Sequence, residues 1–266
     1  EYQAGLTLDP DNTNLLNSLG VALAMLDNNG EAKLCFQRAL QADAANYMAL
    51  CNLGFIAQAQ DQLDEAIDFF TRALPLAAED EQIEQRDNEG HRLAQDLRFY
   101  LGRLYCQTGR YDEAVKILKK WQQLCANERQ RRKAWRYLGE ALAGTGERRQ
   151  AMAALQRALA ANPGDHEAMS LLGELIMRSH EGDEIALSLC RKSVELMPYS
   201  PLYRLRLAEA EYHIGDLPSA LAHCPRPGRL KAGQRAKSER RIVSLLADIY
   251  RQMGETKKAA YWAARK

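Results

Sequence analysis

Apolar residues recur along the chain with the spacing of amphipathic helices, in blocks of nearly constant length. In residues 13–46, Leu16 and Leu23 fall on one helical face, and beyond a polar break a second helix carries Ala32 and Phe36 on its inner face. The strict alternation of apolar and polar residues that strands require is absent. This pattern predicts pairs of amphipathic helices joined by short turns.

The dipeptide Leu-Gly, or Leu-Ala, marks the same place in each block. It begins at Leu19, Leu53, Leu101, Leu138, Leu172, Leu207 and Leu246. The steps between these leucines are 34, 48, 37, 34, 35 and 39 residues. A helical pattern with a period near 34 predicts a helix–turn–helix solenoid, whose core forms between neighbouring repeats and whose long surface is free to bind a partner.

Small residues stand where the helices are expected to approach closely. Gly20 and Ala32 would let the two helices of a pair come together, and Phe36 would fill the gap between one repeat and the next. A glycine also recurs seven residues after the small residue of several Leu-Gly or Leu-Ala dipeptides, at Gly109, Gly146, Gly215 and Gly254. We expect a positive φ there, because glycine adopts it freely and ends a helix by doing so.

These residues resemble the tetratricopeptide repeat family, whose signature is W-x2-L-G-x2-Y, then A-x3-F, then P. The best copy consists of Trp135, Leu138, Gly139, Leu142, Ala151, Leu155, Ala158 and Pro163. The resemblance implies an all-α fold, a right-handed α-solenoid (superhelix) of about seven helix–turn–helix repeats plus one leading helix. It also implies one solenoid domain over residues 1–266.

The repeats are expected near 13–46, 47–80, 95–128, 132–165, 166–200, 201–234 and 240–266. Residues 1–12 read as the end of a truncated repeat, and neither end carries an evident polar capping element. We therefore expect a fragment of a longer chain.

Two segments depart from the period. The acidic insert, residues 79–94, favours a solvated helix extension or ordered loop; the alternative is an acidic flap that regulates access to the groove or docks a basic partner. The basic irregular segment, residues 225–241, begins with Pro225 and Pro227 and favours a solvated linker; the alternative is a patch for phosphate or an acidic partner. From Arg226 to Arg241 it has no aromatic residue, which argues against nucleic acid.

In the family, the first helix of each repeat lines the concave face. Carried over to this chain, that rule gives a groove of Asn17, Asn52, Phe55, Phe99, Tyr100, Arg103, Lys133, Arg136, Tyr137, Glu140 and Arg206. Arginine beside aromatic residues is typical of interface anchors, and arginine grips carboxylates through two nitrogens. The groove is thus expected to bind an acidic or carboxylate-bearing peptide; the alternative is that these aromatics only pack between repeats. Of the two-carboxylate clamp in chaperone-binding members only Asn52 matches, so a heat-shock chaperone tail is not the expected ligand.

Composition narrows the function further. Lys plus Arg number 36 and Asp plus Glu 35, which gives no global attraction to nucleic acid or membranes. No apolar run is long enough to span a membrane. The six cysteines form no CxxC pair and read as reduced thiols of a cytoplasmic protein. Because phosphate-loop, dinucleotide, metalloprotease and nucleophile-elbow motifs are missing and the histidines are dispersed, we expect no enzyme, no cofactor and no metal.

The sequence therefore predicts a non-catalytic protein–protein interaction scaffold. Two alternatives remain open. One is an architectural segment that associates with itself through exposed repeat ends. The other is an intramolecular regulatory segment of a larger protein, such as a bacterial signalling enzyme.

Overall fold

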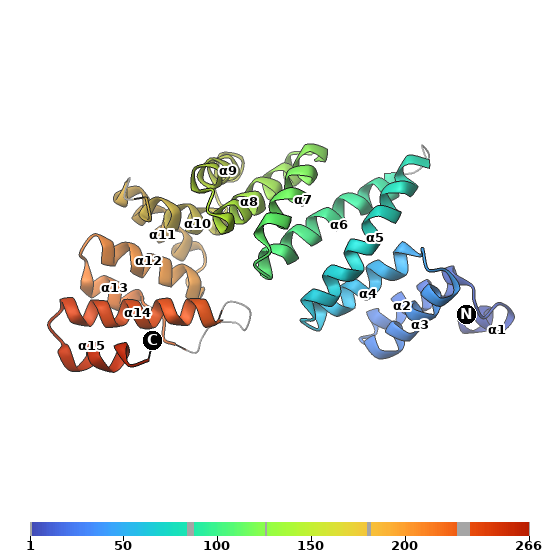
Figure 1. The fold of residues 1–266 in the computed structure, drawn as a ribbon, viewed down its shortest axis with the longest axis horizontal. Coiled ribbons are helices and arrows are strands. Elements are labelled where there is room, and N and C mark those ends of the chain that lie inside the picture. Colours follow the sequence, from blue (N-terminus) through green and yellow to red (C-terminus); the bar gives the residue numbers. More distant parts are fainter. Residues whose placement is uncertain (1, 84–87, 126, 180–181, 228–234, 266) are drawn as a thin grey trace. The chain divides into compact units, whose positions relative to one another are not determined.

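The computed structural model describes residues 2–83, 88–125, 127–179, 182–227 and 235–265, and within these ranges the regular elements are all helices. They form two compact units, residues 1–126 and 127–266. Unit 1 holds a leading helix and three helix pairs (Figure 1). Its helices are α1 (Tyr2–Leu8), α2 (Thr13–Met25), α3 (Asn29–Ala42), α4 (Tyr47–Ala59), α5 (Leu63–Ile83), α6 (Asn88–Gln107) and α7 (Tyr111–Leu124).

Unit 2 holds four more helix pairs. Its helices are α8 (Glu128–Thr145), α9 (Arg148–Ala161), α10 (His166–Met177), α11 (Asp183–Leu196), α12 (Pro201–His213), α13 (Leu217–His223), α14 (Arg235–Gln252) and α15 (Thr256–Ala263). The fold is all-α and built of helical repeats, and the expectation of one leading helix and seven pairs is confirmed over the described residues.

In the first five helix pairs, a glycine of the first helix meets a bulkier side chain of the second. A Cβ added to Gly20 of α2 would lie 2.5 Å from Phe36 Cε1 on α3, so only glycine fits there. Phe36 also joins a buried cluster with Ala49 and Leu53 of α4. The sequence prediction that Gly20 permits close approach and that Phe36 fills the space between repeats is therefore correct.

The same contact recurs through both units with a fixed separation. The pairs are Gly20–Phe36, Gly54–Phe70, Gly102–Leu118, Gly139–Leu155 and Gly173–Cys190. In the last pair the separation is one residue longer, because the turn between α10 and α11 carries an extra residue. These five repeats therefore use a glycine and a bulkier partner to set the spacing of their helices.

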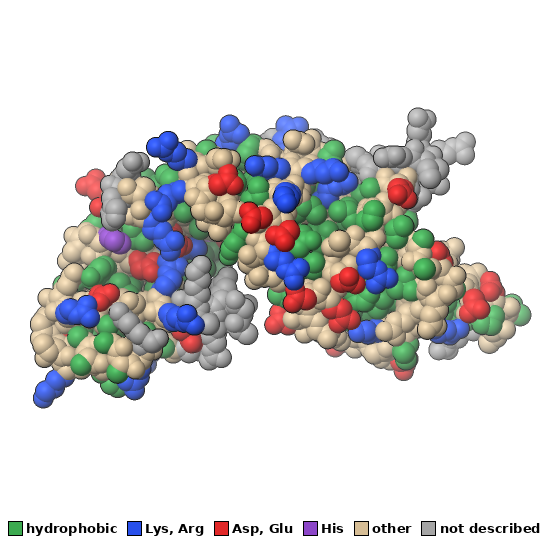
Figure 2. All heavy atoms as spheres, viewed as in Figure 1, with side chains coloured by type: hydrophobic (Ala, Val, Ile, Leu, Met, Phe, Trp, Pro, Cys, Tyr) green, Lys and Arg blue, Asp and Glu red, His purple; other side chains and the backbone are tan. Residues whose placement is uncertain are grey.

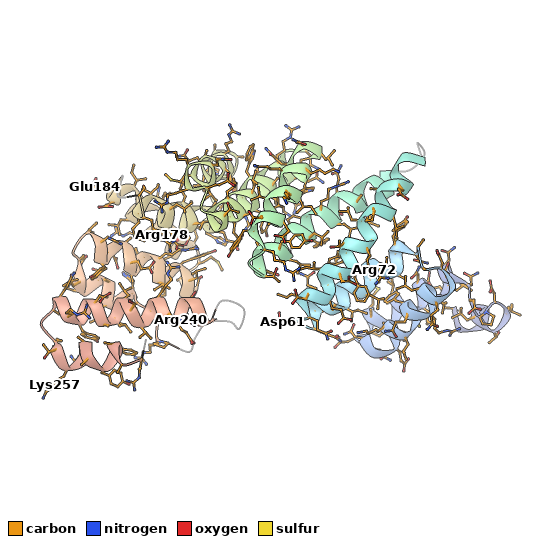
Figure 3. All side chains as sticks on the ribbon, viewed as in Figure 1. Asp61, Arg72, Arg178, Glu184, Arg240 and Lys257 are labelled. Carbon is orange, nitrogen blue, oxygen red and sulfur yellow. The ribbon has the colours of Figure 1, made fainter. Side chains whose placement is uncertain are left out.

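The expected left-handed glycines are also present. Gly109, Gly146, Gly215 and Gly254 have φ of 76°, 87°, 84° and 77°. In the first two repeats, aspartates occupy the equivalent turn position: Asp27 and Asp61 each have φ of 61° (Asp61 is labelled in Figure 3). The turn geometry is thus common to these six repeats, and two of them achieve it without glycine.

Both irregular segments alter helix lengths. α5 and α6 have 21 and 20 residues, so the acidic insert lengthens both helices towards residues 84–87, which lie outside the described residues. In the basic segment, α13 ends at His223, just before Pro225, and α14 begins at Arg235. Residues 228–234 lie outside the described residues.

Candidate functional site

The predicted groove residues fall in both units, and each unit is considered by itself. In unit 1, Phe55 of α4 and Tyr100 of α6 make a T-shaped contact, edge to face, with ring centroids 5.1 Å apart. Phe70 of α5 contacts both rings. Phe55 is 37% exposed, whereas Phe70 is fully buried. The structure thus brings two predicted residues together, and a third aromatic from the core supports them.

Phe99 and Arg103 form a second small group on α6. The Phe99 ring lies 4.9 Å from that of Trp121 on α7, and Arg103 Cζ lies 5.6 Å from the Phe99 centroid. Trp121 is buried, so Phe99 is partly a packing residue between α6 and α7. The sequence left two interpretations of these aromatic residues open, an interface anchor and packing between repeats. The contacts of Phe99 are compatible with both.

The two amide side chains predicted in the groove are Asn17 and Asn52. Asn17 Nδ2 on α2 donates to Asn46 Oδ1 at 3.1 Å, and the same oxygen accepts from the backbone N–H of Ala49. Asn46 is the N-cap of α4, so Asn17 braces the start of the next first helix. Asn52 lies half-buried on α4.

In unit 2, Arg136 of α8 is engaged within the chain. Its Cζ lies 3.9 Å from the Tyr137 ring centroid, its Nε lies 3.6 Å from Asp165 Oδ2, and its Nη1 contacts Glu167. Asp165 is the N-cap of α10, so the guanidinium links two successive first helices. Lys133 is exposed and Glu140 half-buried on the same helix.

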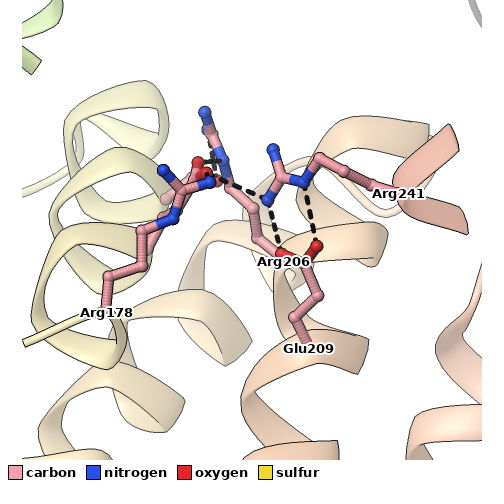
Figure 4. Close-up of polar contacts among 6 residues, drawn as sticks. Arg178, Arg206, Glu209 and Arg241 are labelled. Carbon is pink, nitrogen blue, oxygen red and sulfur yellow. Dashed lines mark hydrogen bonds and ion pairs between the residues drawn. The ribbon is translucent and has the colours of Figure 1, made fainter. Parts of the chain in front are cut away.

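Arg206 of α12 belongs to a larger ionic cluster around Glu174 of α10 (Figure 4). It contacts a carboxylate oxygen of Glu174 through Nε, and its Nη1 donates to Ser170 Oγ at 3.0 Å. Arg178 Nη2 and Arg241 Nη2 reach the other Glu174 oxygen at 2.7 and 2.9 Å. We call Glu174, Arg178, Arg206, Glu209 and Arg241 the Glu174 cluster.

Glu209 completes the cluster at α12. Arg241 Nε of α14 donates to Glu209 Oε1 at 2.9 Å, so Arg241 contacts both glutamates. With three arginines and two glutamates, the cluster retains one formal positive charge. Three successive first helices, α10, α12 and α14, are thereby joined by charged side chains.

Burial and charge act against each other at Glu174, whose exposed fraction is 5%. Burial alone would raise the pKa of Glu174, but Arg206, Arg241 and Arg178 together lower it to about 2. Burial would likewise lower the pKa of Arg241, yet hydrogen bonds and charge from Glu209 and Glu174 raise it. Both groups are therefore ionised at neutral pH.

The exposed side of the cluster carries positive charge. Figure 2 shows Lys and Arg side chains gathered in a stripe over α10, α12 and α14. Arg178 is half exposed and contacts Glu174 through Nη2 (labelled in Figure 3). A guanidinium has five N–H donors, so contacts of this kind leave capacity for an incoming carboxylate.

Sequence reasoning named Arg206 and missed the rest of the cluster as a site. A usable signal was present: Glu174 and Arg206, Glu209 and Arg241, and Lys33 and Glu65 are each 32 residues apart. That is slightly less than one repeat, so residues of opposite charge at this separation meet on successive repeats. In the sequence, Arg241 falls within the basic irregular segment, and only its spacing from Glu209 indicates a partner on the preceding repeat.

Comparison with known proteins identifies the repeats. Models of the tetratricopeptide repeat match residues 49–80, 100–131 and 132–175. The human tetratricopeptide repeat protein 7A is 34% identical over 77 residues, which are 29% of this chain and 9% of that protein. The chain is a tetratricopeptide repeat protein.

Several solved structures share the fold at low sequence identity. One from Parabacteroides merdae has a TM-score of 0.65 at 15% identity and covers 95% of this chain and 91% of its own. YrrB, described as a TPR protein with an unusual peptide-binding site, has a TM-score of 0.61 at 19% identity over 76% of this chain and 95% of its own. Pseudomonas aeruginosa PilF has a TM-score of 0.58 at 14% identity over 96% and 97%.

Tetratricopeptide repeats generally serve as protein–protein interaction scaffolds and are typically non-catalytic. Within the described residues, no three His, Cys, Asp or Glu side chains come together as a metal site. None of the six cysteines forms a disulfide, and all but Cys224 are buried. A search of the described helices finds none with the length and apolar character needed to cross a bilayer.

Proposed function

We propose that unit 2 binds an acidic segment of a partner protein along its first helices, α8, α10, α12 and α14. The observation that carries the proposal is the Glu174 cluster, which holds three arginines on the face of successive repeats with one net positive charge. The cluster is held in place before any partner arrives. Binding therefore costs less conformational entropy than ordering three free arginines would.

The first half of α8 adds to the attraction. Residues 129–136 contain five basic side chains and no acidic one. The cluster and this half-helix lie in the same unit, so an acidic segment could use both. Phe55, Phe99, Tyr100 and Arg103 of unit 1 are proposed as further contacts for apolar and acidic side chains of a partner.

Because Arg136 and Arg206 form ion pairs within the chain, neither is a suitable residue to change in a test of this proposal. Removing Arg136 would take a counter-charge from Asp165 and Glu167, and removing Arg206 would take one from the buried Glu174 and a donor from Ser170. Either change would disturb the repeat as well as the binding surface. Arg178 is the better choice, because it is half exposed and Glu174 keeps Arg206 and Arg241 when Arg178 is removed. Arg149 of α9, exposed and in the same unit, is the matched control.

The test is selection of peptides from a displayed random library on the purified chain, followed by fluorescence anisotropy of the enriched peptides. We expect acidic sequences, and an affinity reduced about threefold to tenfold by Arg178→Ser but not by Arg149→Ser. Raising NaCl from about 50 to about 300 mM should weaken binding, because exposed charges are screened. Enriched peptides without acidic residues, or equal affinity for the wild type and Arg178→Ser, would count against the proposal.

A further inference from the structure

The second helix of the sixth repeat is half as long as the second helices of repeats one, three, four and five. α13 has 7 residues, whereas α3, α7, α9 and α11 each have 14 (Figure 1). The missing half corresponds to about two helical turns. The neighbouring helices α12, α14 and α15 nevertheless form an ordinary repeat core with α13.

The early end of α13 is built into the structure. Pro225 is buried directly after the helix, where it cannot supply the N–H that continued helix would need. Arg204 of α12 donates from Nη2 to the Ala222 carbonyl at 3.1 Å and from Nε to the His223 carbonyl at 3.3 Å. These bonds satisfy carbonyls that a longer helix would have paired itself. A side chain of the preceding helix therefore stabilises the stop.

A cavity of about 800 Å³ lies beside this shortened helix, within unit 2. Side chains from α12 to α15, from the residue Tyr199 before α12 and from the residues after α13 line it, among them Arg204, Ala222, Arg226, Tyr250 and Trp262. Its volume falls within the range of about 300–1,000 Å³ typical of ligand pockets. Tyr199 is 94% exposed, an unusual position for a large aromatic ring.

The lining has two chemical parts. Tyr250, Trp262 and Leu246 provide apolar surface from α14 and α15. Arg204 and Arg226 provide positive charge at the end of α13. An occupant that fits both parts has an apolar side and an acidic side.

We propose that this cavity binds a two-turn amphipathic helix of a partner protein, with apolar residues towards Tyr250 and Trp262 and acidic residues towards Arg226. The partner's helix would take up the packing that the missing half of α13 leaves unused, a form of helix-in-groove recognition. This site lies at the shortened second helix of repeat six, shares no residue with the Glu174 cluster, and goes beyond the function proposed above.

The probe is a hydrocarbon-stapled, fluorescein-labelled peptide of sequence LEEALAA. It keeps the apolar pattern of Leu155–Ala161, the second half of α9, with glutamates at the two polar positions. We expect saturable binding by anisotropy, at least about tenfold weaker for the matched basic peptide LKKALAA. An unstapled LEPALAA peptide should not bind, because proline disrupts the helix.

Variants locate the site. Ala222→Trp should obstruct the cavity and abolish binding, and Arg226→Ser should weaken LEEALAA severalfold while Arg149→Ser leaves its affinity unchanged. An unlabelled LEEALAA peptide should shift the tryptophan emission of the wild type, and Trp262→Phe should remove that shift while preserving affinity. Circular dichroism confirms folding of each variant, and Arg226, which is exposed, gives a test independent of cavity filling.

The proposal is overturned if LEEALAA fails to bind, if LEPALAA binds equally well, or if neither Ala222→Trp nor Arg226→Ser lowers its affinity. Arg178→Ser should leave LEEALAA binding unchanged. Loss of binding in that variant would assign the peptide to the Glu174 cluster and would equally overturn the second site. The two proposals can therefore fail separately.

Discussion

Gly54 of α4 lies directly against the ring of Phe70 of α5: a Cβ built on Gly54 would lie 2.5 Å from Phe70 Cε1 and 2.7 Å from Cδ1. Phe70 is fully buried and cannot move aside freely. The glycine is therefore a packing requirement, distinct from the conformational role that glycine has in the turns.

Replacing Gly54 by alanine should destabilise the protein. Forcing one methyl group into this contact costs about 1–3 kcal/mol of unfolding free energy, although alanine is the better helix former. Urea unfolding followed by circular dichroism measures the change. Gly30→Ala is the control, because Gly30 is helical and a Cβ there meets nothing within 4 Å. Equal free energies of unfolding for the two variants would show that the close contact at Gly54 does not affect stability.

A turn glycine should respond for a different reason. Gly146 has φ of 87° and open space around its Cα, so alanine there meets no clash but adopts a strained backbone. We expect Gly146→Ala to cost about 1 kcal/mol, measured by thermal unfolding. Asp61→Gly, at the equivalent turn position in the second repeat, should cost nothing or stabilise slightly. A stabilising Gly146→Ala would contradict this account.

Acid should weaken unit 2 through Glu174. The folded-state pKa of Glu174, about 2, lies below its ordinary value of 4.5. The stabilisation from its ion pairs is therefore complete above about pH 5 and is lost as the pH falls towards 2, with a size on the order of 3 kcal/mol.

The matched variant for this pH dependence is Glu174→Gln. At neutral pH it should be strongly destabilised, because Arg206 and Arg241 lose their buried counter-charge. Its deficit relative to the wild type should shrink as the pH falls to about 2, where the wild-type carboxyl becomes protonated. Urea midpoints at several pH values measure both proteins, and a deficit that does not change with pH would contradict the assignment.

Three cysteines should resist alkylation in the folded protein. Burial raises the pKa of Cys51, Cys190 and Cys224 to about 12 in each case. Because the thiolate is the reactive form, iodoacetamide at about pH 8 should modify them much more slowly in buffer than in urea. Peptide mass spectrometry resolves each site, and equal rates in buffer and urea at Cys51 would contradict its burial.

Much of the fold could be predicted because the residues that shape each helix pair lie close together in the sequence. The Leu-Gly period, the residues Ala32 and Phe36, and the turn glycines lie within one helix pair, and the pattern fixes their roles. Asp27 and Asp61 were not predicted as left-handed residues, because aspartate adopts several backbone conformations and only the register with Gly146 reveals its role.

The site was less predictable because its contacts join different repeats. Arg136 and Arg206 were predicted as residues free to grip a ligand carboxylate, whereas the structure pairs them with Glu167 and Glu174. Whether an arginine faces solvent or a neighbour depends on the offset between successive first helices. A helical period near 34 residues does not specify that offset to within one side chain. By contrast, the early end of α13 can be predicted from the sequence, because Pro225 and Pro227 cannot continue a helix.

The separation of 32 residues between paired charges has a mechanical consequence. In unit 2, guanidinium–carboxylate contacts connect α10 to α12 and α12 to α14, in addition to the apolar contacts between these helices. Elsewhere, successive repeats are held by buried alkyl and aromatic groups together with polar links such as Arg136–Glu167 and Asn17–Asn46. Tension applied along these helices would be carried partly by these contacts, and because the Glu174 carboxylate is buried, added salt would weaken them only slightly.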